Sequence, residues 1–288
     1  MVELQIVILA VAGSSPVGHP TFLAAAKSAC RATLAPMLRR VSFFLLCFAA
    51  LPFGAVADWH VEKRERLPAP GAVEFSRLVA KSPSASVRLH VVTFSAKSHT
   101  LALMDDPQNA FDLATASRKR GAVAAVNGGY FRPDRTPLGL RIRQGREIHP
   151  LERAALLSGI IVVRDSRVAL LRLREFNPAP PPAEALQAGP FLVDGGKPVA
   201  GLDAARADAR TAVFTDGASR WGVISTDALT LADLGAILAQ AEIVPGGKIT
   251  RALNLDGGSS SGLWVAGAPP FYRRELRDVR DFLAIVPR

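Results

Sequence analysis

The sequence predicts an α+β fold, in which a mixed, largely antiparallel sheet system carries two principal helices packed against it. Segments that alternate apolar and polar residues outnumber segments with a helical period, which favours strands. Short turns rich in Gly, Asp and Ser join these segments, and such turns indicate hairpins rather than long crossovers. Hydrophobic residues make up 49% of the 288 positions, which is enough to bury the core of one large domain.

The amino-terminal region contains the pattern of an export signal. Met37 is followed by the basic pair Arg39 and Arg40, by an apolar run over residues 41–51, and by small residues that end at Ala57. This order of basic, apolar and small residues is typical of a signal peptide. The apolar run is shorter than the roughly 20 residues that a membrane span needs. We therefore expect a signal peptide over residues 37–57, with cleavage after Ala57.

Residues 1–36 precede this complete signal and are not expected in the protein. A signal peptide works from the extreme amino terminus, so Met37 is the expected start and residues 1–36 are interpreted as a spurious upstream extension. The mature chain would be a single domain over residues 58–288, periplasmic or secreted, with no stable membrane span after cleavage.

Loss of the leader changes both the cysteine count and the charge. Cys30 and Cys47 both precede the cleavage site, so a mature chain would have no disulfide, thiolate nucleophile or zinc–thiolate site. The leader also removes four of the 35 basic and one of the 25 acidic residues, which leaves a net charge of about +7. Because no aromatic-rich basic motif accompanies this charge, we expect an anionic substrate or envelope glycan as partner and no nucleic acid.

The first half of the mature chain predicts strands around one helix. Residues 58–86 show no sustained period. Residues 87–94 and 99–104 alternate and predict an antiparallel pair across the turn at 95–98. Asp106 and Pro107 are expected to open a helix that the basic pair Lys119 and Arg120 closes before Gly121.

The second half predicts further strands and a second helix. The expected strands are 138–142, a hairpin of 159–163 with 168–173, 191–193, an antiparallel pair of 210–215 with 221–226, 251–255 and 282–286. Residues 178–182 form a proline-rich crossing loop, and 184–187 are expected to form a helical turn. Thr230 and Asp233 make a capping box for a helix over 231–241, whose apolar stripe faces the core.

Two of the expected strands end in the same unusual way. Residues 252–263 read ALNLDGGSSSGL, and residues 121–131 read GAVAAVNGGYF. In each, a small apolar strand delivers a polar side chain and then a glycine pair, which allows backbone conformations that other residues avoid. A hairpin turn would explain either motif alone. Together they predict two strand ends that meet on one rim and form the lips of a cleft.

Five blocks of sequence resemble the phosphodiester glycosidase family. They are NGGYF at 127–131, AGPFLV at 188–193, ARTAVFTDG at 209–217, LTLADLGAIL at 229–238 and NLDGGSSS at 254–261. The blocks occur in the family's order, and the resemblance covers residues 87–286. It implies a hydrolase that cleaves a sugar from a glycosyl phosphodiester, with a cell-envelope or exopolysaccharide substrate because of the export signal. The resemblance implies no cofactor, and structural calcium bound by loop carboxylates remains an open alternative.

This chemistry suggests roles for three charged residues. Glycosidases commonly use two carboxylates on either side of the reacting sugar carbon. Asp256, at the end of one glycine-rich strand, is the first candidate. Asp216 is the second, because it also ends a strand in an Asp-Gly turn. Arg210 is expected to bind the phosphate through its planar guanidinium.

The remaining candidates are expected to contact substrate. The glycines would supply space and backbone donors, the amide side chains would bind sugar hydroxyls, and the aromatic ring would stack on a sugar face. These residues are Asn127, Gly128, Gly129, Tyr130, Asn254, Gly257, Gly258 and Ser259.

Other interpretations were compared with this one. Residues 258–262 match the G-x-S-x-G nucleophile elbow, but no histidine follows His149, so the Ser, acid, His order of such hydrolases is missing. Clustered histidines are also missing, so we expect no catalytic metal. The alternative that stays open is a non-catalytic envelope protein that binds glycans in the same cleft.

Overall fold

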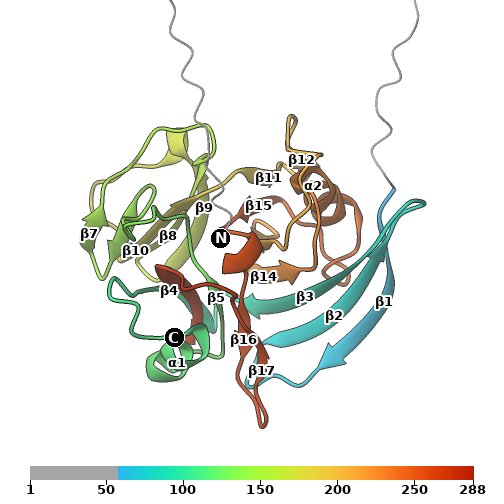
Figure 1. The fold of residues 1–288 in the computed structure, drawn as a ribbon, viewed down its shortest axis with the longest axis horizontal. Helices are drawn as coiled ribbons and strands as arrows, with labels where there is room; N and C mark the ends of the chain where they lie inside the picture. The colour runs from blue at the N-terminus through green and yellow to red at the C-terminus, as the bar shows by residue number, and fades with distance from the viewer. Residues whose placement is uncertain (1–57) are drawn as a thin grey trace, which may run out of the picture. The chain divides into compact units, whose positions relative to one another are not determined.

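A computed structural model describes residues 58–288, which form three β-sheets with two α-helices and two short 3-10 turns (Figure 1). The predicted signal peptide and the upstream extension lie outside these residues. Within 58–288 no helix has the length and apolar character needed to cross a membrane. The α+β prediction is confirmed, and strands predominate.

The largest sheet has eight antiparallel strands in the order β1-β2-β3-β14-β13-β15-β11-β12. Their bounds are β1 His60–Leu67, β2 Glu74–Lys81, β3 Ser86–Ser95, β14 Arg220–Thr226, β13 Thr211–Thr215, β15 Arg251–Asn254, β11 Phe191–Asp194 and β12 Lys197–Pro198. Helix α2, Leu231–Gln240, packs its apolar stripe on this sheet. Thr230 caps it by accepting a hydrogen bond from the Asp233 amide, as predicted.

Two five-stranded sheets complete the fold. One has the order β7-β6-β10-β8-β9, with bounds Arg146–His149, Arg141–Arg143, Glu184–Ala188, Gly159–Arg164 and Arg167–Arg172. The other has the order β17-β16-β5-β18-β4, with bounds Phe271–Arg273, Leu263–Val265, Ala124–Asn127, Asp281–Pro287 and His99–Asp105. Helix α1, Leu113–Arg120, packs on this last sheet. The 3-10 turns are η1 Leu173–Glu175 and η2 Gly258–Ser260.

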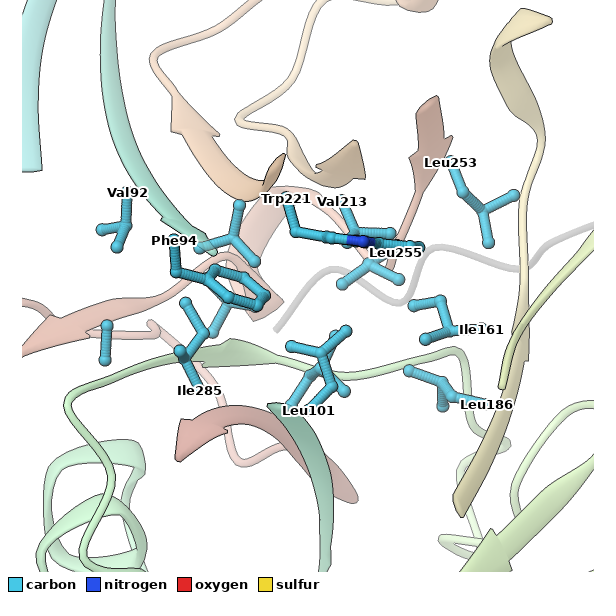
Figure 2. Close-up of a cluster of buried hydrophobic side chains, with 14 of the residues drawn as sticks. Val92, Phe94, Leu101, Ile161, Leu186, Val213, Trp221, Leu253, Leu255 and Ile285 are labelled. Carbon is cyan, nitrogen blue, oxygen red and sulfur yellow. The ribbon is translucent and has the colours of Figure 1, made fainter. Parts of the chain in front are cut away.

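One hydrophobic core joins all three sheets. Its side chains come from strands of every sheet, as Figure 2 shows for Phe94 of β3, Leu101 of β4 and Leu186 of β10. Each is nearly inaccessible to solvent. Because burial of apolar surface is the main favourable contribution to folding, this shared core fixes how the three sheets meet.

Three predicted elements are corrected by the structure. Strands β3 and β4 exist, but they do not pair: β3 pairs with β2 and β14, and β4 pairs with β18. Both strands instead contribute side chains to the same core cluster, so the chain turns a corner between two packed sheets at residues 95–98. Residues 184–187 form strand β10 rather than a helical turn, because β6 and β8 pair with it on both edges.

The first helix begins later than predicted. The Asp106 carboxylate accepts hydrogen bonds from the amides of Ala110 and Phe111, at 3.0 and 2.9 Å, and so orders a loop. Asp112 is the actual cap, because its side chain accepts from the Thr115 amide at 2.8 Å. The basic residues at the end and the left-handed Gly121 (φ 69°) terminate α1 as expected.

Candidate functional site

The two glycine-rich strand ends lie side by side, which confirms the prediction of a common rim. The Asp256 amide donates to the Gly128 carbonyl at 3.1 Å. The Asn127 side-chain amide also donates to the Asp256 carbonyl, at 2.8 Å. The end of β5 is therefore hydrogen-bonded directly to the turn that follows β15.

Asn127 connects three segments of the chain and does not face a ligand. Its side-chain oxygen accepts from the Thr211 hydroxyl at 2.7 Å and from the Gly262 amide at 3.1 Å. The residue is 1% exposed. The expectation that it binds sugar hydroxyls is corrected, because its amide group is buried and hydrogen-bonded within the protein.

Asn254 and Tyr130 form a second internal connection. The Asn254 amide donates to the Tyr130 hydroxyl at 2.8 Å and to the Leu255 carbonyl at 2.6 Å. The Tyr130 hydroxyl donates in turn to the Gly189 carbonyl at 2.6 Å. Burial, and next the charge of Asp256, raise the pKa of Tyr130, so its hydroxyl stays neutral. Buried Asn254 thus holds Tyr130 through its amide, whereas its side-chain oxygen has no hydrogen-bond partner within residues 58–288. Its contact with sugar hydroxyls stays a prediction.

The glycines of the first motif make room for protein side chains. A Cβ on Gly128 would overlap the Asp281 carboxylate, and a Cβ on Gly129 would overlap the Arg141 guanidinium. The Gly129 amide donates to Asp281 Oδ1 at 2.8 Å. The expectation that Gly128 and Gly129 accommodate ligand is therefore corrected: they allow a buried ion pair to approach the backbone.

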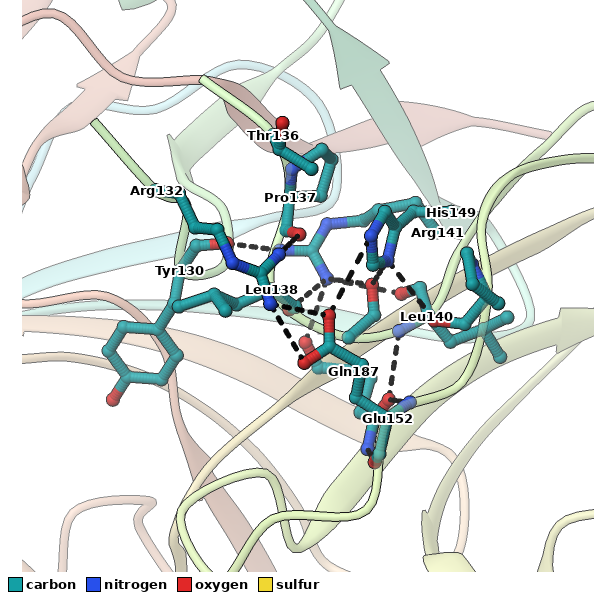
Figure 3. Close-up of polar contacts among 12 residues, drawn as sticks. Tyr130, Arg132, Thr136, Pro137, Leu138, Leu140, Arg141, His149, Glu152 and Gln187 are labelled. Atoms are coloured by element: carbon teal, nitrogen blue, oxygen red, sulfur yellow. Dashed lines mark hydrogen bonds and ion pairs between the residues drawn. The ribbon is translucent and has the colours of Figure 1, made fainter. Parts of the chain in front are cut away.

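That ion pair joins Arg141 Nε to Asp281 Oδ2 at 2.7 Å, and both side chains are fully buried. The rest of the Arg141 guanidinium donates to backbone carbonyls, including those of Gln187 at 2.9 Å and Tyr130 at 3.2 Å (Figure 3). The sequence analysis missed both residues. Arg143 stands in the same strand as Arg141, and Arg280 precedes Asp281, so neither charge stands out in the sequence.

The second motif carries a half-buried carboxylate on a tight turn. Asp256 Oδ1 accepts from the Gly257 amide at 2.9 Å, and the Gly258 amide donates to the Ala209 carbonyl at 2.7 Å. Gly258 has φ +61°, a left-handed conformation that favours glycine. Burial raises the pKa of Asp256, although hydrogen bonds from Ser260 and Gly257 oppose the rise. Ser259 is exposed at the end of this turn.

Arg210 approaches the same turn. Its Nη1 lies 3.8 Å from the position that a Cβ would take on Gly257. Nε donates to the Leu229 carbonyl at 2.9 Å and Nη2 to the Arg206 carbonyl at 2.6 Å. Within residues 58–288 no carboxylate lies within 4.0 Å of this guanidinium. Burial lowers its pKa from the usual value. Arg210 is thus a fixed cation with no ion-pair partner in the described chain.

Asp216 lies elsewhere. It follows the opposite end of β13 from Arg210, and five strand residues separate the two. Its Oδ1 accepts from the Ala218 and Arg220 amides, at 2.8 and 3.1 Å, so it closes the β13–β14 hairpin. The structure does not bring Asp216 together with Asp256, and the expected carboxylate pair of these two residues is corrected.

Two charged residues near the Asp256 turn were missed by the sequence analysis. The Asp208 carboxylate lies beside Gly258, at 3.7 Å from its Cβ position. The Arg277 guanidinium lies 4.9 Å above the Phe131 ring and is close enough to Asp256 to oppose the rise of its pKa. Neither residue stands in a glycine-rich motif or directly follows a strand, so neither gave a signal.

A cavity of about 440 Å³ adjoins the turn on the side of Arg277. It lies between residues 109–112 and 274–279. The Leu276 amide donates to the Ser259 carbonyl at 2.8 Å, which attaches one wall of the cavity to the turn. The cavity is thus joined to the turn through Leu276, and residues 254–261 do not line it.

The structure is that of an α+β protein whose paired strand ends present a half-buried carboxylate. Beside this carboxylate's turn lies an arginine that has no acidic partner among residues 58–288. Comparison of the sequence with protein families identifies the phosphodiester glycosidase family over residues 120–286. The chain belongs to the phosphodiester glycosidase family. No curated protein sequence matches it.

Solved structures share the fold. The catalytic domain of zebrafish N-acetylglucosamine-1-phosphodiester alpha-N-acetylglucosaminidase, which is auto-inhibited by its pro-peptide, matches with a TM-score of 0.59 and 16% identity, over 80% of this chain and 89% of that chain. A hypothetical protein from Synechocystis matches with a TM-score of 0.56 and 16% identity, over 78% of this chain and 64% of that chain. At such identities the likeness concerns the fold.

Proposed function

We propose that this protein is an exported hydrolase that cleaves a sugar from a glycosyl phosphodiester of the cell envelope or an exopolysaccharide. The observation that carries the proposal is the arrangement at Gly257: its amide donates to the Asp256 carboxylate, and Arg210 Nη1 lies 3.8 Å from its Cβ position. Membership of the phosphodiester glycosidase family supports the reaction class.

The Asp256 carboxylate and the Arg210 guanidinium are opposite in charge to the sugar carbon and to the phosphate, respectively. Cleavage of the bond between the sugar carbon and the phosphate oxygen leaves positive charge on the carbon, which the Asp256 carboxylate stabilises. The phosphate carries negative charge, which Arg210 Nη1 binds. Because the guanidinium is held through Nε and Nη2 by backbone carbonyls, it keeps its position when the substrate binds. A phosphate monoester is a stable leaving group, so it needs little protonation.

The test is release of free sugar. The protein would be purified from cells that express the full coding sequence and supplied with N-acetyl-α-glucosamine 1-(phenyl phosphate) and with the same ester of other sugars. This first probe follows the name of the zebrafish relative. The proposal predicts release of free sugar from at least one ester, and loss of that release in Asp256→Asn. Binding without release from any ester would instead support a non-catalytic glycan-binding envelope protein.

A further inference from the structure

A second carboxylate borders the turn that carries Asp256. Asp208 Oδ1 is the side-chain atom nearest to the Cβ position on Gly258, at 3.7 Å. The segment of Asp208 is fixed there by two backbone hydrogen bonds with Leu229, of 3.2 and 2.9 Å, and by the bond from the Gly258 amide to the Ala209 carbonyl. These backbone hydrogen bonds, rather than a flexible side chain, therefore place Asp208 beside the turn.

The position of Asp208 contrasts with that of Asp216. Asp208 precedes β13 and Asp216 follows it, so the five residues of the strand lie between them. At about 3.3 Å per residue, Asp216 is removed from the turn by roughly 16 Å. Paired glycosidase carboxylates are about 5 to 9.5 Å apart. Only Asp208 lies at the end of β13 that contacts the turn of Asp256.

The surroundings of Asp208 leave its carboxylate accessible. Its side chain is 30% exposed, and Oδ2 accepts from Arg206 Nε at 2.6 Å. The Arg206 side chain is 77% exposed, and ion pairs at such exposed positions contribute little to stability. Oδ1 points toward Gly258, on the side of the turn. Asp208 can thus contact both solvent water and a molecule held on the turn.

We propose that Asp208 is the second catalytic carboxylate of this protein and acts as the general base that activates water. This proposal rests on the function proposed above. Asp208 accepts one proton from water while the water oxygen forms a bond to the sugar carbon. The bond from that carbon to the phosphate oxygen breaks, and its electron pair leaves with the phosphate monoester. Asp208 then releases the proton to solvent, which restores the carboxylate.

Three variants separate this role from a structural one. Asp208→Asn keeps the size of the side chain and removes the base, and should lower kcat by about 10²- to 10⁴-fold, the usual contribution of a general base. Arg206→Ala removes the ion pair and leaves the carboxylate, and should keep kcat within about twofold. Asp216→Asn alters the other aspartate that borders β13 and should also leave kcat unchanged. Melting curves of all three check that the fold is retained.

Azide provides a second measurement. In Asp208→Ala, sodium azide should restore turnover and yield a glycosyl azide, because azide is a strong nucleophile and needs no base. A merely structural defect would not respond. The proposal is overturned if Asp208→Asn turns over the ester normally, if Arg206→Ala loses as much activity as Asp208→Asn, or if azide restores nothing. An inactive wild-type protein would overturn both proposals, whereas an active wild type with an active Asp208→Asn overturns only this one.

Discussion

The Asp256 carboxylate is half-buried, and its charge is needed for the proposed reaction. The activity should therefore depend on pH. Burial disfavours the ionised form, and the pKa of Asp256 is therefore raised. In the proposed reaction only the ionised form stabilises the sugar cation. The carboxylate exists above its pKa, so activity should be lost as the pH falls through the raised value.

Asp256→Asn should lower kcat by on the order of 10²- to 10³-fold, as for other electrostatic groups at the reacting atom, with little change in substrate binding. In the wild type, the acidic limb of the kcat profile should lie above the usual aspartate pKa of about 3.9. Steady-state kinetics from pH 3 to pH 8 measure both effects. Turnover by Asp256→Asn within a fewfold of wild type would remove this residue from the mechanism.

Arg210→Ala should chiefly raise KM for glycosyl phosphodiesters, because a contact to the phosphate is lost in the ground state and in the transition state alike. The comparison is with an uncharged aryl glycoside of the same sugar, whose KM should change little. Arg220→Ala is the control, because Arg220 is the first residue of β14, at the end of the β13–β14 pair opposite to Arg210. An equal effect of Arg210→Ala on both substrates would argue against phosphate binding.

The motifs could be located from the sequence, but the direction in which their side chains point could not. Asp256 and Arg210 were singled out because each lies in a glycine-rich or family-like block, and their roles stay predictions. Asn127 and Gly129 were assigned to the ligand, since their actual partners, such as Asp281, lie 152 residues away along the chain. Asp216 was chosen as the second carboxylate because it ends a strand in an Asp-Gly turn, and sequence alone does not show which end of a strand reaches the site.

At the scale of elements, the rim depends on the ion pair that joins β6 to β18. Arg141→Met leaves the Asp281 carboxylate buried without its partner and should destabilise the protein by about 3–5 kcal/mol. Arg143→Met, two residues along the same strand and exposed, should cost under about 0.5 kcal/mol. Urea denaturation of the two variants measures the difference. Equal stabilities would show that the pair is not needed to hold the rim.

Helices and strands could be predicted where the residues that determine them lie within a few positions of one another. The β8–β9 hairpin and α2 were located from turn and capping residues that act within a few positions. The strand pairing of β3 and β4 was wrong, because the partner of each strand is set by packing between distant segments. Strand β10 was missed for the same reason: its residues favour a helix, and its two neighbouring strands override this preference.

At the scale of the whole molecule, Glu184 makes stability depend on pH. Burial raises its pKa to about 7 from 4.5. A carboxyl group whose pKa is raised in the folded state adds stability that is complete below its unfolded pKa and is lost as the pH rises through the folded value. The melting temperature should therefore fall between pH 5 and pH 8. Glu184→Gln should flatten this dependence, whereas Glu147→Gln, on an exposed position, should not.

The amino terminus provides a separate prediction for the whole protein. If Met37 is the start and cleavage follows Ala57, the exported protein begins at Asp58. Intact-mass spectrometry of protein from the periplasm or medium measures this directly. Detection of residues 1–36 on the exported protein would contradict both parts of the prediction.

The contact between Gly129 and Asp281 also has a consequence for synthesis. The two residues are 152 positions apart, so a ribosome that adds roughly 5–20 residues per second needs on the order of ten seconds to travel from one to the other. During this interval the first glycine loop exists without the aspartate that anchors it. A nascent chain thus has no assembled rim until β18 emerges, and the proposed enzyme gains activity only after translation has passed its final strand.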